Sequence, residues 1–108
     1  MKNNTLYGLK EEIINKIIEV FKKFEAVDKA ILYGSRAKGN YSNGSDIDIA
    51  LFGDGLNLNI LNKIENEIDD LMLPYAFDLS IYNQIKNQNL IERIERVGVE
   101  IYSKNNSR

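Results

Sequence analysis

Cysteine and histidine are both absent from this sequence of 108 residues. Without cysteine, the chain has no disulfide framework and no thiolate metal site. Without histidine, it has no Ser-His or Cys-His nucleophile system, no histidine general base and no ordinary zinc site. A catalyst in this chain must therefore use carboxylates, hydroxyls, lysine, arginine or a hard metal ion. Carboxylate and hydroxyl oxygens suit magnesium, with manganese as the alternative.

An excess of positive charge and a long apolar run are also missing. The chain has 14 Lys and Arg against 16 Asp and Glu, which gives a formal net charge of −2. Nucleic-acid-binding proteins usually carry a basic excess, so we expect no direct nucleic-acid partner, although a single nucleotide needs only a local positive charge. No apolar stretch approaches membrane-spanning length, and the first residues do not read as a signal peptide. We therefore expect a cytoplasmic protein without a membrane partner.

The composition is that of an ordinary globular protein. Hydrophobic residues make up 44% and charged residues 28%, which argues against disorder. The length fits a single domain, residues 1–108. A domain this small leaves much of its surface exposed, so a partner subunit would add stability.

Hydrophobic periodicity divides the chain into alternating helices and strands. Short apolar or alternating segments predict strands at residues 29–33, 46–52, 76–82 and 99–102. Apolar residues at helical spacing predict three amphipathic helices, and a short helix is expected after the first strand. The stripes of these three helices are Leu9, Ile13, Ile17, Phe21 and Phe24; Ile60, Leu61, Ile64, Ile68 and Leu71; and Ile85, Ile91, Ile94 and Val97. This order predicts an α/β (α+β) fold with one small sheet of about four strands flanked by helices.

Helix ends are marked by residues that favour caps. Asn57 or Asn59 is the expected cap of the second long helix, and Asn83 that of the last one. Gly98 is expected to end the last helix.

Two aspartates stand two residues apart at the start of the second predicted strand. Because alternate residues of a strand point to the same face, Asp46 and Asp48 project together while Ile47 and Ile49 face the core. Adjacent carboxylates repel each other, and a divalent cation between them removes that penalty. Two metal ions about 3.5–4 Å apart can clamp the attacking and leaving oxygens of a phosphoryl transfer.

Gly34 and Ser35 stand at the turn from the first strand into the short helix. Glycine lets the backbone approach a phosphate, a helix N-terminus offers N–H groups, and the Ser35 hydroxyl can donate a hydrogen bond. Arg36 and Lys38 place positive charge nearby; the alternative for both is solvated charge or a salt bridge. Ser45 is a further candidate nucleotide ligand, with a role in the turn as the alternative.

Asp78 is the third candidate metal ligand. It lies mid-strand between Phe77 and Leu79 and points to the face opposite both. If this strand is next to that of Asp48, the three carboxylates form a cluster in which Asp78 also serves as general base on an attacking hydroxyl. The alternative is a strand residue that faces solvent.

These residues resemble the signature of the minimal nucleotidyltransferases, which are the smallest members of the DNA polymerase beta-like superfamily. The resemblance lies in Gly34-Ser35, ten intervening residues, Asp46-Ile47-Asp48 and a later strand aspartate, and it extends over nearly the whole chain. It implies a nucleotidyltransferase fold with a small mixed sheet. It also implies that Gly34 and Ser35 bind the triphosphate of ATP, that Asp46 and Asp48 bind Mg²⁺, and that Asp78 is the third acidic residue.

The resemblance also implies a biological role. Stand-alone proteins of this kind resemble the antitoxin half of bacterial toxin–antitoxin pairs, whose partner is a helical HEPN-domain toxin. Some such antitoxins transfer AMP from ATP to a toxin tyrosine. Two alternatives stay open: a non-catalytic antitoxin that neutralises its toxin by binding, and one subunit of a two-chain nucleotidyltransferase for small molecules such as aminoglycosides. The sequence leaves open the acceptor, the base selectivity and the oligomeric state.

Overall fold

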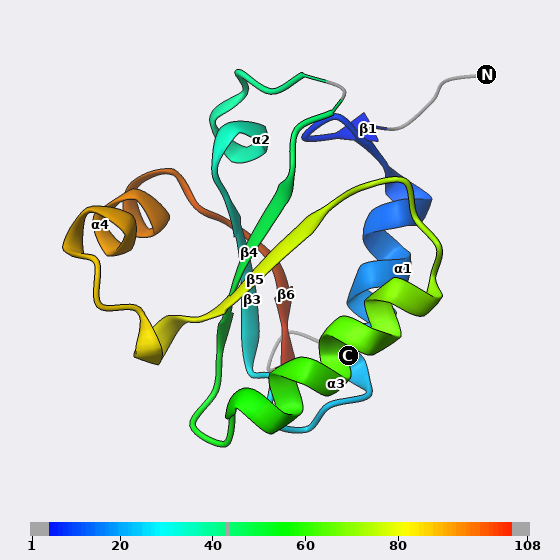
Figure 1. Cartoon of the computed structure of the whole chain (residues 1–108). Helices are drawn as coiled ribbons and strands as arrows, with labels where there is room; N and C mark the ends of the chain where they lie inside the picture. Colours follow the sequence, from blue (N-terminus) through cyan, green and yellow to red (C-terminus); the bar gives the residue numbers. More distant parts are fainter. Residues whose placement is uncertain (1–4, 43, 105–108) are drawn as a thin grey trace.

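A four-stranded mixed sheet with the order β5-β4-β3-β6 forms the centre of the molecule (Figure 1). The computed structural model describes residues 5–42 and 44–104. The strands are β3 (Lys29–Tyr33), β4 (Ile47–Phe52), β5 (Phe77–Ile81) and β6 (Val99–Ser103). β4 and β5 are parallel, whereas β3 is antiparallel to both β4 and β6. This arrangement confirms the predicted fold class.

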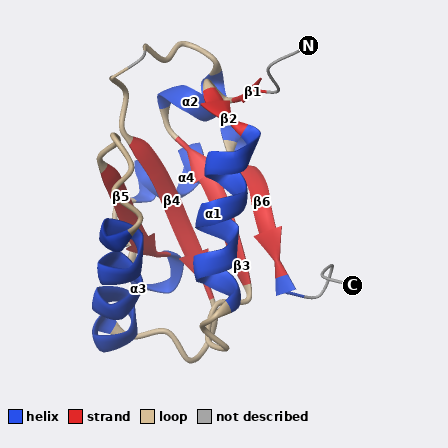
Figure 2. Ribbon diagram, turned by 90° about the vertical axis from the view of Figure 1, so that its right-hand side faces the viewer, coloured by secondary structure: helices blue, strands red, loops and turns tan. Residues whose placement is uncertain are grey.

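Helices cover both faces of this sheet unequally. Figure 2 shows α1 (Glu11–Lys22) and α3 (Leu58–Asp70) side by side on one face, with α4 (Gln88–Val97) behind the other. The short α2 (Ser35–Lys38) follows β3 directly, and a 3₁₀ turn, η1 (Tyr82–Gln84), follows β5. Among the described residues, no helix is long and apolar enough to cross a membrane.

The larger hydrophobic core lies between the sheet and the α1–α3 layer. Its members with no exposed surface are Phe21, Val27, Ala30, Ile49, Leu51 and Ile64. A smaller cluster of Tyr33, Ala50 and Ile94 packs under α4 on the opposite face. Next to this cluster, Asp48 of β4 is half-buried and Asp78 of β5 is exposed.

Most of the predicted elements are confirmed. β3 spans the predicted residues, and β4 begins one residue later than expected, so that Asp46 precedes the strand. Asn57 caps α3, because its side chain accepts a hydrogen bond of 2.9 Å from the Ile60 N–H. Gly98 ends α4, although with φ of −66° it is not left-handed. A Cβ at Gly98 would lie only 2.2 Å from the carbonyl oxygen of Ile94.

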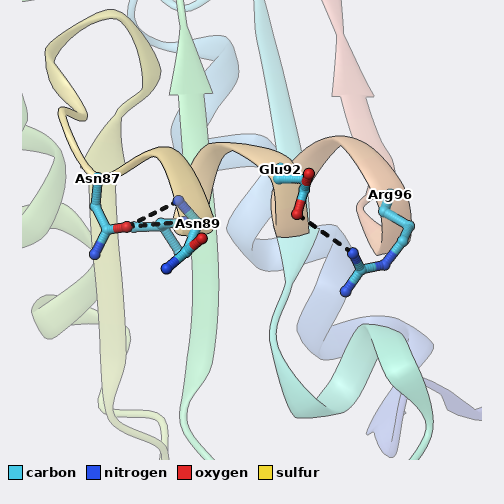
Figure 3. Close-up of polar contacts among 5 residues, drawn as sticks. Asn87, Asn89, Glu92 and Arg96 are labelled. Atoms are coloured by element: carbon cyan, nitrogen blue, oxygen red, sulfur yellow. Dashed lines mark hydrogen bonds and ion pairs between the residues drawn. The ribbon is translucent and has the colours of Figure 1, made fainter.

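The predicted start of the last helix is wrong. α4 begins at Gln88, where the Asn87 side chain accepts hydrogen bonds from the N–H groups of Asn89 and Leu90 (Figure 3). Asn83 lies instead in η1. The Tyr82 ring stacks on Phe52 at a centroid distance of 4.3 Å and holds the chain against the sheet, which delays the helix.

The first helix also starts later than expected. Leu9 lies in a short hairpin of β1 (Thr5–Leu6) and β2 (Leu9–Lys10) that precedes α1. The turn uses positive φ angles at Tyr7 (58°) and Gly8 (79°), a conformation incompatible with a continuing helix. Leu9 is still buried in the main core, which explains why it fits the apolar stripe.

Candidate active site

Asp48 and Asp78 lie side by side on the sheet. The parallel register of β4 and β5 pairs Asp48 with Asp78, between the pairs Ile47–Phe77 and Ile49–Leu79. In-register residues on adjacent strands project to the same face, and Ile47 and Ile49 are buried in the main core. Both carboxylates therefore point to the α4 face, where Asp48 is half-buried and Asp78 is exposed.

Asp46 joins this pair from the residue before β4. Burial raises the pKa of Asp48, and the negative charges of Asp78 and then Asp46 raise it further. The ionised Asp48 is thus held in an unfavourable field that a bound cation would relieve. Oxygen ligands of this kind are the donors that Mg²⁺ prefers, so the chemistry of these residues fits the metal.

The carboxylates of Asp46, Asp48 and Asp78 do not converge on one point in this structure. In the side-chain positions of residues 5–42 and 44–104, no group of three acidic residues is close enough to hold a metal ion. Asp46 and Asp78 are both exposed, so rotation of their side chains could bring their oxygens toward Asp48. The backbone therefore brings the candidate ligands together, while their final positions depend on rotamers.

Tyr33 is a further residue of this site, and it was not among the predicted site residues. Antiparallel pairing sets Tyr33 directly opposite Asp48, and the side chain is buried. Burial raises the pKa of Tyr33; a hydrogen bond with the Ser80 side chain opposes the rise, and the charges of Asp78 and Asp48 add to it. The phenol is therefore neutral at the floor of the site. The sequence feature that could have identified Tyr33 as a site residue is its position directly before Gly34.

Gly34 is required at its position for two reasons. Its φ of 82° and ψ of −159° belong to a region that is essentially restricted to glycine. A Cβ at this position would lie 2.3 Å from Oδ2 of Asp48, so a side chain would displace that carboxylate. Gly34 is thus in direct contact with the carboxylate of Asp48.

A hollow of about 340 Å³ lies beside this turn and is lined by cationic side chains. Gly34, Ser35, Lys38 and Asn40 form one wall, and Arg93 and Arg96 of α4 form the other. Because α2 has only one turn, its dipole is small, and most of the positive charge must come from Lys38 and the two arginines. This arrangement suits a polyphosphate.

Arg93 and Arg96 were not among the predicted site residues. They lie three positions apart on α4, so they share one helix face, but no local signal connects that face to Gly34. Arg96 pairs with Glu92 at 3.8 Å (Figure 3), and both side chains are largely exposed. Such a surface pair is weak, so a phosphate could replace Glu92 at little cost.

The structure does not bring Arg36 or Ser45 into this hollow. Arg36 is 1% exposed, and its guanidinium donates to the carbonyl oxygens of Ser45 and Tyr7. The Ser45 hydroxyl accepts a hydrogen bond of 2.8 Å from the Ser42 N–H. In this structure the polar groups of both residues make hydrogen bonds within the protein that hold the loop, whereas Lys38 lines the hollow.

A strand-borne carboxylate pair beside a glycine turn and a cationic hollow is the arrangement expected of a nucleotidyl-transfer site. The profile of the family described as polymerase beta, nucleotidyltransferase, matches residues 15–107. The chain belongs to this family. A Methanocaldococcus jannaschii protein named as a candidate protein adenylyltransferase, MJ0141, is 30% identical in an alignment that covers 80% of this chain and 99% of the relative.

Solved structures share the fold at low sequence identity. A crystal structure described as a toxin–antitoxin with AMP-PNP superposes with a TM-score of 0.69 at 20% identity and covers 84% of this chain and 73% of that chain. A tri-AMPylated Shewanella oneidensis HEPN toxin in complex with MNT antitoxin gives a TM-score of 0.66 at 18% identity, covering 88% and 73%. A candidate nucleotidyltransferase from Sulfolobus solfataricus gives 0.54 at 18%, covering 89% and 82%.

Proposed function

We propose that this protein is a Mg²⁺-dependent adenylyltransferase that transfers AMP from ATP to a tyrosine of a HEPN-domain toxin and thereby acts as its antitoxin. The observation that carries the chemistry is the in-register pair of Asp48 and Asp78 beside the Gly34 turn. The relative named as an adenylyltransferase and the neighbour that contains an AMPylated HEPN toxin support the choice of nucleotide and acceptor.

In this proposal the site has two adjoining parts, one that binds the triphosphate and one that binds the metal ion. Lys38, Arg93 and Arg96 hold the triphosphate in the hollow beside Gly34 and Ser35. Asp46 and Asp48, with Asp78, are the residues that would hold Mg²⁺, which when bound offsets the charge of the phosphates and of the transition state.

Asp78 is the best-placed general base. It is the exposed member of the strand pair and lies on β5, at the edge of the sheet, where an acceptor hydroxyl can reach it. Its carboxylate takes the proton as the acceptor oxygen forms a bond to the α-phosphorus. The bond between the α-phosphorus and its bridging oxygen breaks, and pyrophosphate leaves.

Transfer of label from ATP tests this proposal. The purified protein is incubated with Mg²⁺ and a candidate HEPN-domain protein, using ATP labelled at either the α- or the γ-phosphate. The α-label should appear on a tyrosine of the partner, and the γ-label should appear in pyrophosphate. Asp48→Asn and Asp78→Asn should each reduce transfer by about 100-fold or more, because each removes a group that acts at the reacting atoms.

The control removes the same charge at the other end of β4. Asp54 lies in the exposed turn after that strand, so Asp54→Asn should leave transfer unchanged. A tight complex that forms without labelling and is insensitive to Asp46→Asn with Asp48→Asn would contradict the enzyme proposal. That result would favour an antitoxin that works by binding alone.

A further inference from the structure

Arg36 is a charged side chain enclosed almost completely by the protein. Its Nε and Nη2 donate to the carbonyl oxygen of Ser45 at 3.2 and 3.0 Å, and its Nη1 donates to the carbonyl oxygen of Tyr7 at 3.0 Å. The guanidinium lies over the rings of Tyr41 and Tyr75, at 5.5 and 5.3 Å from their centroids. Burying a charge is costly, so this set of partners indicates a specific task.

Two of the hydrogen bonds of Arg36 go to the peptide group that precedes Asp46. Asp46 lies outside β4, so the strand ladder does not fix both of its flanking peptide groups. On one side, the Ile47 N–H donates to the Ala76 carbonyl oxygen at 2.9 Å. On the other side, the Ser45 carbonyl accepts two hydrogen bonds from Arg36. These two attachments together fix the backbone from which the Asp46 carboxylate projects.

We propose that Arg36 is a positioning residue that holds Asp46 in place for metal binding. The proposal rests on the proposed function, in which Asp46 is a Mg²⁺ ligand. Arg36 belongs to α2, which begins directly after Gly34, so one side chain connects the phosphate-binding turn to the loop with the first aspartate. The planar fork of arginine suits this bridge, whereas a lysine ammonium cannot reproduce its geometry.

The N-terminal hairpin is part of the same support. The Tyr7 carbonyl that accepts from Arg36 lies in the turn between β1 and β2. A Cβ at Gly8 in that turn would lie 2.7 Å from Nη1 of Arg36 and 2.5 Å from Cε1 of Tyr41. A change at Gly8, which is distant in sequence from every candidate metal ligand, should therefore disturb Asp46 through Arg36.

Two measurements on Arg36→Lys test the proposal. In metal-free protein, hydrogen exchange of the peptide covering residues 40–47 should become at least tenfold faster than in the native protein. In calorimetric titrations with Mg²⁺ in the presence of a non-hydrolysable ATP analogue, affinity should fall by about 10-fold or more, as for other residues that orient a metal ligand. In an Asp46→Asn background, Arg36→Lys should weaken Mg²⁺ binding no further.

Val27→Ala is the control for a general loss of stability, since Val27 is fully buried at the opposite end of β3. It should leave loop exchange and Mg²⁺ affinity unchanged. If Arg36→Lys does not fold, Gly8→Ala should show both effects at smaller size. Native exchange in the loop or native Mg²⁺ affinity in these variants would overturn the proposal. Absence of Mg²⁺ binding by the native protein would instead refute the proposed function, while the exchange data would still show whether Arg36 holds the loop.

Discussion

Replacing Gly34 by alanine should harm the protein in two separable ways. The first is backbone strain, because Gly34 has φ of 82° and ψ of −159°. An L-residue in such a region costs about 1–3 kcal/mol. In a domain of this size, each kcal/mol lowers the melting temperature by about 4–8 °C, so we expect a loss of about 10 °C.

The second effect is displacement of Asp48. The new Cβ would lie 2.3 Å from Oδ2 of Asp48, and ordinary contact begins near 3.4 Å, so the carboxylate must move by about 1 Å. A misplacement of this size at a reacting centre can reduce the rate by about 100-fold. AMP transfer measured well below the melting temperature should therefore fall by about that factor.

Gly39→Ala separates the two effects. Gly39 also has a positive φ, 96°, but a Cβ there would meet no atom within 4 Å. We expect about 1–2 kcal/mol of strain and a rate within about threefold of native. Equal losses of activity in the two variants, or native activity in Gly34→Ala, would refute the reasoning, because the contact with Asp48 would then not matter.

Three further changes have defined outcomes. Burial and two neighbouring carboxylates raise the pKa of Asp48 above 3.8, so ionisation of Asp48 destabilises the metal-free fold. In EDTA at pH 7, Asp48→Asn should therefore have a higher melting temperature than the native protein. This difference should disappear as the pH falls to 3.8, because Asp48 is then protonated in the folded protein. A difference independent of pH would contradict this. Arg93→Gln with Arg96→Gln should raise the KM for ATP about tenfold with a smaller effect on kcat, measured by pyrophosphate release, because these side chains line the hollow in the ground state. Asn57→Ala should cost about 1 kcal/mol in denaturant unfolding because it removes the α3 cap, whereas Asn59→Ala should cost nothing measurable.

Local patterns were sufficient to predict much of the fold. The apolar run Lys29–Tyr33 and the alternation around Asp78 depend only on neighbouring residues, and both became strands. The phase of Asp78 relative to Phe77 and Leu79 placed it on the correct face. The sequence order could not show that β5 pairs with β4, and the resemblance to the minimal nucleotidyltransferases implied only that Asp78 is the third acidic residue.

The errors came from interactions between distant residues. Arg36 and Lys38 look equivalent in sequence, yet one is buried against backbone carbonyls and the other lines the hollow. Arg93 lines the same hollow as Lys38 because α4 and α2 both pack against β3, which the sequence order does not show. Asn83 and Asn87 are both good caps, and the position of the preceding chain against the sheet decides between them.

The parallel pairing of β4 and β5 makes the proposed active site depend on a long connection. Residues 53–76 connect these two strands and contain α3. This connection must cross over the sheet before β5 can pair with β4. Strand side chains alternate between faces, so a shift of β5 by a single residue would turn Asp78 into the hydrophobic interior. The packing of α3 through Leu61, Ile64 and Ile68 thus helps to set the alignment of Asp48 with Asp78, although these three residues lie in the core and not among the candidate metal ligands.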